Sequence, residues 1–241
     1  MQICPVCFWE DAPGEAYYNG SNEVPLVHGQ RHFLETGACE DHFKDGVRPP
    51  LPGEARPDDW HSFDDLCSRL TDLIEKEFRS VLRDGGVTLH QMDVLDDWGG
   101  EEQLKKAALE DPEETWQEIP HEKLSHFHQS LAFLDHSGFR FYLPAFMRHA
   151  LVTAHPDIES AEISGVLWSL YKGPDTGYRK ETFDLLTLGQ KHCVGAFMHL
   201  FATMGCGGGC DTSDARQGLR KGWSAFVPHF VKLSTPVAPL Y

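Results

Sequence analysis

The chain has 241 residues, of which 41% are hydrophobic and 24% are charged, and its formal net charge at pH 7 is -16. This length suits one large domain or one domain with a small appendage, and the composition is that of a protein with a packed core. The acidic excess disfavours nucleic acid and anionic membrane surfaces as partners and suits a basic protein surface, although acidity also serves solubility alone.

The start of the chain and its cysteines predict a cytoplasmic location. A Cys-Pro-Val-Cys motif begins at Cys4, where a secretion signal would have a basic and then an apolar segment. No apolar run approaches the roughly 20 residues that span a bilayer. The seven cysteines are odd in number and scattered, unlike a disulfide framework. We therefore expect reduced thiols and no membrane partner.

Residues 1–57 show little periodicity and are predicted to form a small irregular module. One helix is expected from Leu26 to Thr36, ended by Gly37. Residues 47–57 contain several prolines, and proline removes a backbone donor and restricts the residue before it. This stretch is therefore predicted to be an extended linker to a mainly helical domain, residues 58–241.

Capping boxes and apolar spacing predict three helices after the linker. Each begins with a Ser, Thr or acidic residue, and glycines end the first two. The expected helices run from Ser62 and Asp65 to Leu82, before Gly85-Gly86; from Thr88 and Gln91 through Asp97, before Gly99-Gly100; and from Glu101 to Leu109.

The second half of the domain is predicted to alternate helices with short extended pieces. Pro120 is expected to open a helix whose apolar face reaches Leu134, followed by a turn over residues 135–138. Pro144 is expected to open another helix after a brief alternating stretch. The remaining predictions are an extended piece over Ile163–Tyr171, a helix opened by Thr187 and Gln190, a last helix from Ser213 through Val227, and a loosely held tail after Pro228.

The fold class is therefore predicted to be mainly α, without internal repeats. The helical spacings point one set of apolar side chains in the same direction, and these should share the core. The predicted core contains Leu70, Leu73, Phe78, Phe127, Leu131, Phe141, Phe197, Leu200 and Trp223.

Cys4 and Cys7 are the candidate metal ligands. Two thiolates separated by two residues can hold one Zn²⁺ in a tight knuckle, but a closed structural site needs four ligands and the chain has no second Cys-x-x-Cys motif. A thioredoxin-like redox role would need a strand before the motif and a helix after it, and the sequence predicts neither.

Residues 3–52 resemble the small bacterial cysteine-rich CPCC domain. The resemblance implies a zinc knuckle whose first half, a Cys-Pro-Cys-Cys element, is absent here, so we expect the natural reading frame to extend upstream and zinc to bind only a full-length form. Cys39 matches a family cysteine. His28 and His32 depart from the family pattern, although their spacing would let them complete a site. The matching segments are residues 3–11 (ICPVCFWED), 17–22 (YYNGSN), 37–40 (GACE), Phe43 and residues 47–52 (VRPPLP).

Residues 66–227 resemble a second bacterial family, one of unknown function, which implies no activity. The most distinctive segment is FRFYLPAFMR, residues 139–148. The other matching segments are residues 86–90, 95–99, 116–120, 131–135, 169–171, 183–190 and 214–216.

Other chemistry-bearing residues have simpler structural explanations. The acidic residues between Asp93 and Glu102 lack the spacing of an EF-hand and suit solvated helix ends. His192, Cys193 and His199 could form a nucleophile with a base, but Cys193 lies on an apolar helix face. Cys206-Gly-Gly-Gly-Cys210 is interpreted as a loop. The clustered histidines His121, His126, His128 and His136 fit no His-Glu-x-x-His motif.

The leading hypothesis is a non-catalytic cytoplasmic protein that acts through contacts with a protein partner, as an immunity-like or regulatory protein. The alternative is an enzyme with an anionic-substrate pocket, in which Arg140 and Arg148 clamp the substrate and Tyr142 or His149 handles protons. A nucleic-acid-binding zinc ribbon is opposed by the net charge. The sequence predicts no catalytic residue and no certain cofactor.

Overall fold

The structure, a computed structural model, describes residues 2–11, 22, 24–56, 58–154, 160–177, 179–204 and 212–234. These residues are mainly α-helical, which confirms the predicted fold class. The two strands in this part of the chain, β1 (Gln2–Ile3) and β2 (Glu10–Asp11), pair antiparallel. Cys206, Cys210 and the segment 17–21 lie outside the described residues.

The long helices α2 (Phe63–Glu77), α6 (His136–Thr153) and α9 (Leu188–Met204) form the centre of the molecule. The core between them is rich in fully buried aromatic rings. Every predicted core residue is buried except Leu73, which is half-buried.

No helix of the described chain combines the length and the apolar character needed to cross a bilayer.

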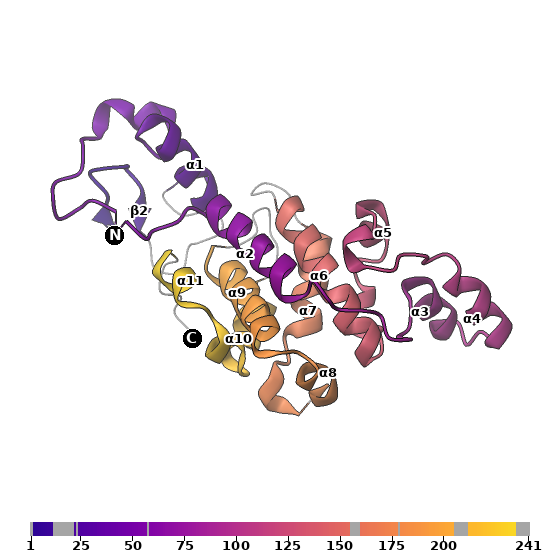
Figure 1. The fold of residues 1–241 in the computed structure, drawn as a ribbon. Helices are drawn as coiled ribbons and strands as arrows, with labels where there is room; N and C mark the ends of the chain where they lie inside the picture. The colour runs from indigo at the N-terminus through magenta and orange to yellow at the C-terminus, as the bar shows by residue number, and fades with distance from the viewer. Residues whose placement is uncertain are drawn as a thin grey trace.

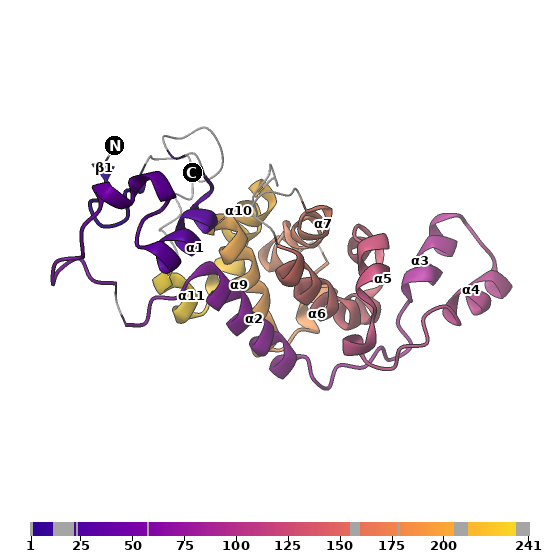
Figure 2. The same ribbon diagram turned by 90° about the horizontal axis from the view of Figure 1, so that it is seen from above.

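The molecule is elongated, and two small units lie at its opposite ends (Figures 1 and 2). The N-terminal module contains β1, β2, α1 (Leu26–Thr36) and the 3-10 turn η1 (Asp41–Gly46). The other end is the helical hairpin of α3 (Leu89–Asp96) and α4 (Glu101–Ala108). Two different surfaces are therefore presented far apart.

The helix starts predicted at Ser62 and Thr88 are confirmed by their capping hydrogen bonds. In α2, the Ser62 hydroxyl accepts from the Asp65 N–H at 3.2 Å, and the Asp65 carboxylate accepts from the Ser62 N–H at 3.2 Å. Thr88 and Gln91 form the same reciprocal pair at the start of α3. Local side-chain acceptors thus fix where these helices begin.

The prediction that Pro144 opens a helix is wrong, because α6 starts eight residues earlier and contains Pro144 in its interior. Asp135 caps this helix: its carboxylate accepts from the Gly138 N–H at 2.8 Å and from the Val87 N–H at 3.0 Å. An interior proline costs about 3 kcal/mol, and the burial of most of α6 in the core offsets this cost.

The segment predicted to be extended, Ile163–Tyr171, is instead helix α7 (Ala161–Leu170). The Ser160 hydroxyl accepts from the Ile163 N–H at 3.2 Å and starts the helix. At Gly165 the helix comes so close to the His128 carbonyl that a Cβ atom would overlap with it. Tertiary packing against α6 and the 3-10 turn η3 (Ser130–Phe133) therefore overrides the β propensity of the segment.

Three predicted helices end earlier than expected. The first, α2, stops at Glu77, and the Phe78 carbonyl accepts from the Trp116 indole N–H at 2.9 Å. The helix expected after Pro120 is replaced by two short elements, α5 (His121–His126) and η3. Between them, the His128 carbonyl lies against Gly165 of α7. The last, α10 (Ser213–Arg220), ends before Gly222, whose φ of 119° breaks the helix.

The prediction of a loosely held tail after Pro228 is wrong for residues 229–234, which form a helix. Helix α11 (His229–Ser234) packs on α9 and buries Val231. The remaining elements are short: η2 (Trp116–Glu118), η4 (Pro174–Thr176), α8 (Lys180–Asp184) and η5 (Trp223–Phe226).

Candidate functional site

Two of the cysteines lie in the tight turn between β1 and β2. The Cys4 N–H donates to the Trp9 carbonyl at 2.8 Å, and the Phe8 N–H donates to the Cys4 carbonyl at 2.8 Å. Phe8 takes a left-handed φ of 66°, which reverses the chain. The Cys7 thiol consequently lies within hydrogen-bonding reach of the Cys4 thiol.

Cys39, just after α1, lies beside this turn. Its N–H donates to the Cys7 carbonyl at 2.7 Å, and its side chain is buried. Burial raises the pKa of Cys7 to about 11 and that of Cys39 to about 11, because a thiolate is poorly solvated there. Both groups are therefore neutral thiols at pH 7 in the metal-free protein.

The thiols do not make up a metal site by themselves. Within the described residues, no group of three or more His, Cys, Asp or Glu side chains is arranged to hold a metal ion. His32 is no substitute ligand, because its Nδ1 lies 2.9 Å from the Ala38 carbonyl oxygen and its Nε2 lies 3.3 Å from an Asp41 oxygen. The residues present do not fit a closed tetrahedral zinc site, which needs four ligands.

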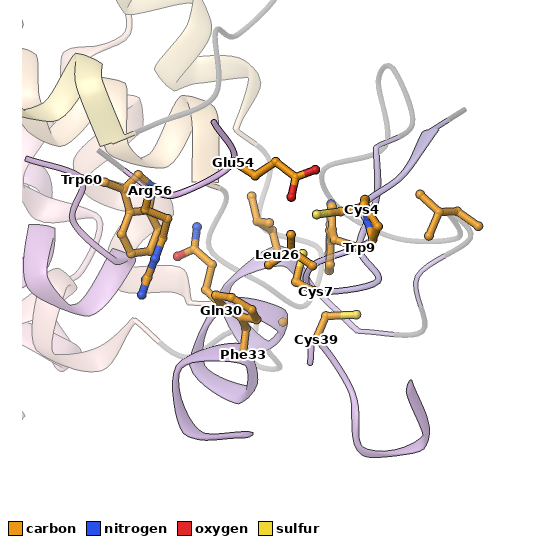
Figure 3. Close-up of a pocket in the computed structure, with 14 residues that line it drawn as sticks. Cys4, Cys7, Trp9, Leu26, Gln30, Phe33, Cys39, Glu54, Arg56 and Trp60 are labelled. Carbon is orange, nitrogen blue, oxygen red and sulfur yellow. The ribbon is translucent and has the colours of Figure 1, made fainter. Parts of the chain in front are cut away.

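A cavity of about 510 Å³ lies within the N-terminal module and is closed on one side by Trp60, just before α2 (Figure 3). Apolar side chains and the three thiols form most of its wall, and Gln30, Glu54 and Arg56 add polar groups. Gly29 lets the Trp9 ring close one side, since a Cβ atom at this position would lie 2.7 Å from that ring. The lining residues are Ile3, Cys4, Pro5, Val6, Cys7, Trp9, Leu26, Gly29, Gln30, Phe33, Cys39, Glu54, Arg56 and Trp60.

Arg148, one of the side chains proposed for an anionic-substrate pocket, has other partners. Arg148 donates to a Glu75 oxygen at 2.8 Å and to the Gln117 carbonyl at 3.1 Å, and its guanidinium lies 4.9 Å from the centre of the Trp116 ring. Tyr142 is buried, and burial raises its pKa to about 12. The structure thus uses Arg148 to join α6 to α2 and η2, and neither residue lines the cavity.

Of the other two residues in that hypothesis, Arg140 is half-buried and its Nε atom has no hydrogen-bond partner. His149 is buried and faces α5, where its Nδ1 lies 2.7 Å from His121 Nδ1 and its Nε2 lies 3.0 Å from the Ser125 hydroxyl oxygen. Burial and the neighbouring His121 lower the pKa of His149, and the contacts of its ring with His121 and Ser125 tie α5 to α6.

The clustered histidines do not form one site. His136 contacts Thr182 at 2.6 Å and Glu181 at 3.0 Å, whereas His128 donates from Nδ1 to the Ser125 carbonyl at 2.9 Å. The possible nucleophile Cys193 is fully buried, and burial raises its pKa to about 12. Burial also lowers the pKa of His199 to about 4. These residues pack in the fold and present no activated thiolate.

The α3–α4 hairpin at the other end of the molecule carries an exposed tryptophan. Trp98 follows the end of α3 and is 95% exposed, with a left-handed φ of 58°. Its N–H donates to the Leu95 carbonyl at 3.2 Å, and the Gly99 N–H donates to the Val94 carbonyl at 2.8 Å. These are the hydrogen bonds of a Schellman motif, in which the residue at this position is usually glycine.

Exposed acidic residues precede and follow Trp98 in the sequence of the hairpin. Leu95 is 49% exposed one turn before the tryptophan. Two lysines on α4 oppose the larger number of carboxylates, and one of them pairs with Glu101 at 2.8 Å. The exposed acidic residues of the hairpin are Asp93, Asp96, Asp97, Glu101, Glu102 and Glu110.

Comparison with known families accounts for both parts of the chain. Residues 67–214, more than half of the sequence, match the model of the Family of unknown function (DUF6714). The chain belongs to this family. Its first part, residues 1–54, matches the Cysteine-rich CPCC model, and both resemblances expected from the sequence are confirmed. No curated protein and no solved structure matches this DUF6714 chain.

The cavity and the exposed tryptophan were not predicted from the sequence of this DUF6714 protein. Trp60 and Arg56 belong to the linker, where composition indicates only an extended chain, and Phe33 meets them through tertiary packing. Trp98 had a local signal, because Trp-Gly-Gly after an acidic helix end places an aromatic residue where a glycine usually ends the helix.

Proposed function

We propose that this protein is a non-catalytic cytoplasmic protein-interaction protein, immunity-like or regulatory in role, and that its α3–α4 hairpin contacts a basic surface of its partner. The observation that supports this proposal most strongly is Trp98, a large aromatic side chain that is 95% exposed in a strained backbone conformation. Such residues are favoured at the centres of protein interfaces.

Folding stability does not explain why a tryptophan occupies this position. A left-handed conformation costs a residue with a Cβ atom roughly 1–2 kcal/mol, and glycine would avoid that cost. The exposed ring gains almost no burial within the chain. Residues kept in strained conformations cluster at functional sites, so the strain supports a role outside the folded chain.

The charge of the hairpin indicates the kind of partner. Exposed carboxylates lie on both sides of Trp98 in the sequence, at Asp96 and Asp97 before it and at Glu101 and Glu102 after it. This arrangement suits a partner with an apolar pocket for the indole ring and basic side chains around that pocket. The same charges would repel nucleic acid.

Cys4 and Cys7 enter the proposal as zinc ligands only in a form of the protein that supplies further donors. Their turn places two thiols side by side, and two more ligands would complete a structural site. Such a site would stabilise the N-terminal module and would take no part in chemistry.

Site-specific photocrosslinking in cells tests the docking proposal. A photoreactive amino acid at position 98 is compared with one at Asp72, an exposed position on α2. We expect an adduct from position 98 alone, and the captured protein, identified by mass spectrometry and then purified, should have a basic surface. An adduct at neither position, or at both equally, contradicts the proposal.

The purified partner then allows a matched mutational test. Trp98→Gly should weaken binding by about thirtyfold or more, as expected for a central aromatic contact. Trp168→Ala, at a tryptophan 42% exposed on α7, should change the affinity less than about threefold. Equal effects of the two substitutions would remove the hairpin from the interface.

A further inference from the structure

The cavity within the N-terminal module has the size and lining of a small-molecule site. Its volume of about 510 Å³ lies in the range of sites that take drug-sized ligands. Three aromatic side chains reach it from separate segments: Trp9 from the turn before β2, Phe33 from α1, and Trp60 from the residues before α2 (Figure 3). A flat apolar ligand would therefore contact rings on several sides.

The wall of the cavity contains one uncompensated positive charge. The Arg56 guanidinium carbon lies 4.8 Å from the centre of the Trp60 ring and 5.5 Å from that of Phe33. In the described part of the chain, these rings are its partners and no carboxylate pairs with it. Glu54 is not available for pairing, because it binds Arg48 through contacts of 2.6 and 2.7 Å.

Gln30 supplies a second donor to the same cavity. Its side-chain oxygen accepts from the Phe63 N–H at 3.2 Å, which orients the amide group. The Nε2 atom has no hydrogen-bond partner among the described residues, so its two hydrogens remain available. Figure 3 shows the Gln30 and Arg56 side chains among those that line the cavity.

We infer that this cavity binds a small apolar carboxylate, with the apolar body among Trp9, Phe33 and Trp60 and the carboxylate on Arg56 and Gln30. A planar guanidinium already held against two rings loses little freedom when it pairs with a carboxylate. In a chain of net charge -16, an unpaired cation beside an apolar cavity selects an anion against the surrounding field. The site lies far from the hairpin and goes beyond its proposed docking role.

The test compares 2-naphthoate with the isosteric neutral 2-naphthamide by titration calorimetry on the full chain. We expect saturable binding of both, with the acid about threefold to tenfold tighter because its ion pair with Arg56 is partly exposed. Arg56→Gln should remove this difference. Arg69→Gln, a matched change at an exposed arginine on α2, should leave it intact. Phe33→Ala should weaken both ligands.

Several outcomes would overturn the inference. These are the absence of saturable binding at millimolar ligand, equal affinity for acid and amide, and a preference for the acid that survives Arg56→Gln. A tripeptide with a C-terminal tryptophan, tested as free acid and as amide, distinguishes the source of the carboxylate. Tighter binding of the peptide acid than of 2-naphthoate would assign the cavity to a protein C-terminus and contradict a small-molecule site.

Discussion

The two ends of the molecule differ in shape and in chemistry. At the N-terminal end, aromatic side chains and thiols surround a cavity, and the unpaired charge there is a cation, Arg56. At the other end, the α3–α4 hairpin carries an exposed tryptophan that carboxylates flank in the sequence. Apolar cavities are typical sites for small ligands, whereas an exposed aromatic side chain is typical of a surface that contacts a protein partner. The central helices hold these two surfaces apart.

The largest expected effect is a loss of stability in the core of the central helices, which separate the two ends. Leu131→Ala should lower the free energy of unfolding by roughly 2–5 kcal/mol, because Leu131 is fully buried and the substitution leaves a cavity. Leu95→Ala in the hairpin, at a side chain 49% exposed, should cost well under half as much. Urea denaturation of both variants checks this. Equal losses would mean that the hairpin is part of the core.

Lowering the pH should also decrease the free energy of unfolding of the central helices. Burial lowers the folded-state pKa of His199 to about 4, below the ordinary value of 6.5, and it also lowers the pKa of His149. The unfolded chain therefore binds protons more readily, so the stability supplied by neutral His199 is complete above about pH 6.5 and is lost as the pH falls toward 4. After a discount for solvent screening, we expect a loss on the order of 2 kcal/mol from His199.

Urea unfolding between pH 7 and pH 4 measures this effect. His199→Gln should flatten the pH dependence, whereas His126→Gln, at an exposed histidine, should not. A stability that is constant over this range, or that rises toward pH 4, would show that these histidines are solvated in the folded state.

The cysteine turn should contribute little stability in the chain as it stands. Cys4→Ser is expected to change the free energy of unfolding by about 1 kcal/mol or less, because two thiols do not make a closed zinc site. Elemental analysis of protein purified without chelator should give less than one equivalent of zinc. One tightly bound equivalent, lost in Cys4→Ser, would contradict this prediction.

The smallest expected effect is at the projecting tryptophan. Trp98→Gly should raise the stability by roughly 0.5 kcal/mol, because relief of the left-handed strain exceeds the extra entropy that glycine gives the unfolded chain. Trp98→Ala, which keeps the Cβ atom, should not show this gain. Thermal melts of the two variants provide the comparison. Destabilisation by Trp98→Gly would show that the ring packs on the hairpin.

Local signals in the sequence predicted the starts of α2 and α3 but not the tertiary contacts. Ser62 and Thr88 cap helices through residues three positions away, so their roles were visible in the sequence. The start of α6 was missed because Pro144 is a strong local signal, and only the buried packing of that helix outweighs it. Likewise α7 contains β-branched residues that pack as a helix against α6.

The candidate sites were less predictable than the fold. Cys4 and Cys7 were recognised from their spacing, but the cavity beside them depends on Arg56 and Trp60 meeting Phe33, residues more than twenty positions apart in the sequence. Arg148 matched the pattern of a substrate clamp, yet its guanidinium binds Glu75 on a distant helix. Such pairings arise only when the core assembles, and no local pattern specifies them.

Hydrogen exchange on the complex with the identified partner tests the central claim most directly. We expect binding to protect the backbone amides of residues 93–102 around Trp98 and to leave those of the N-terminal module, residues 26–39, unchanged. The matched complex with the Trp98→Gly variant should show no protection at the same concentrations. Protection of the module with an unchanged hairpin would contradict the proposal that this protein meets its partner through α3 and α4.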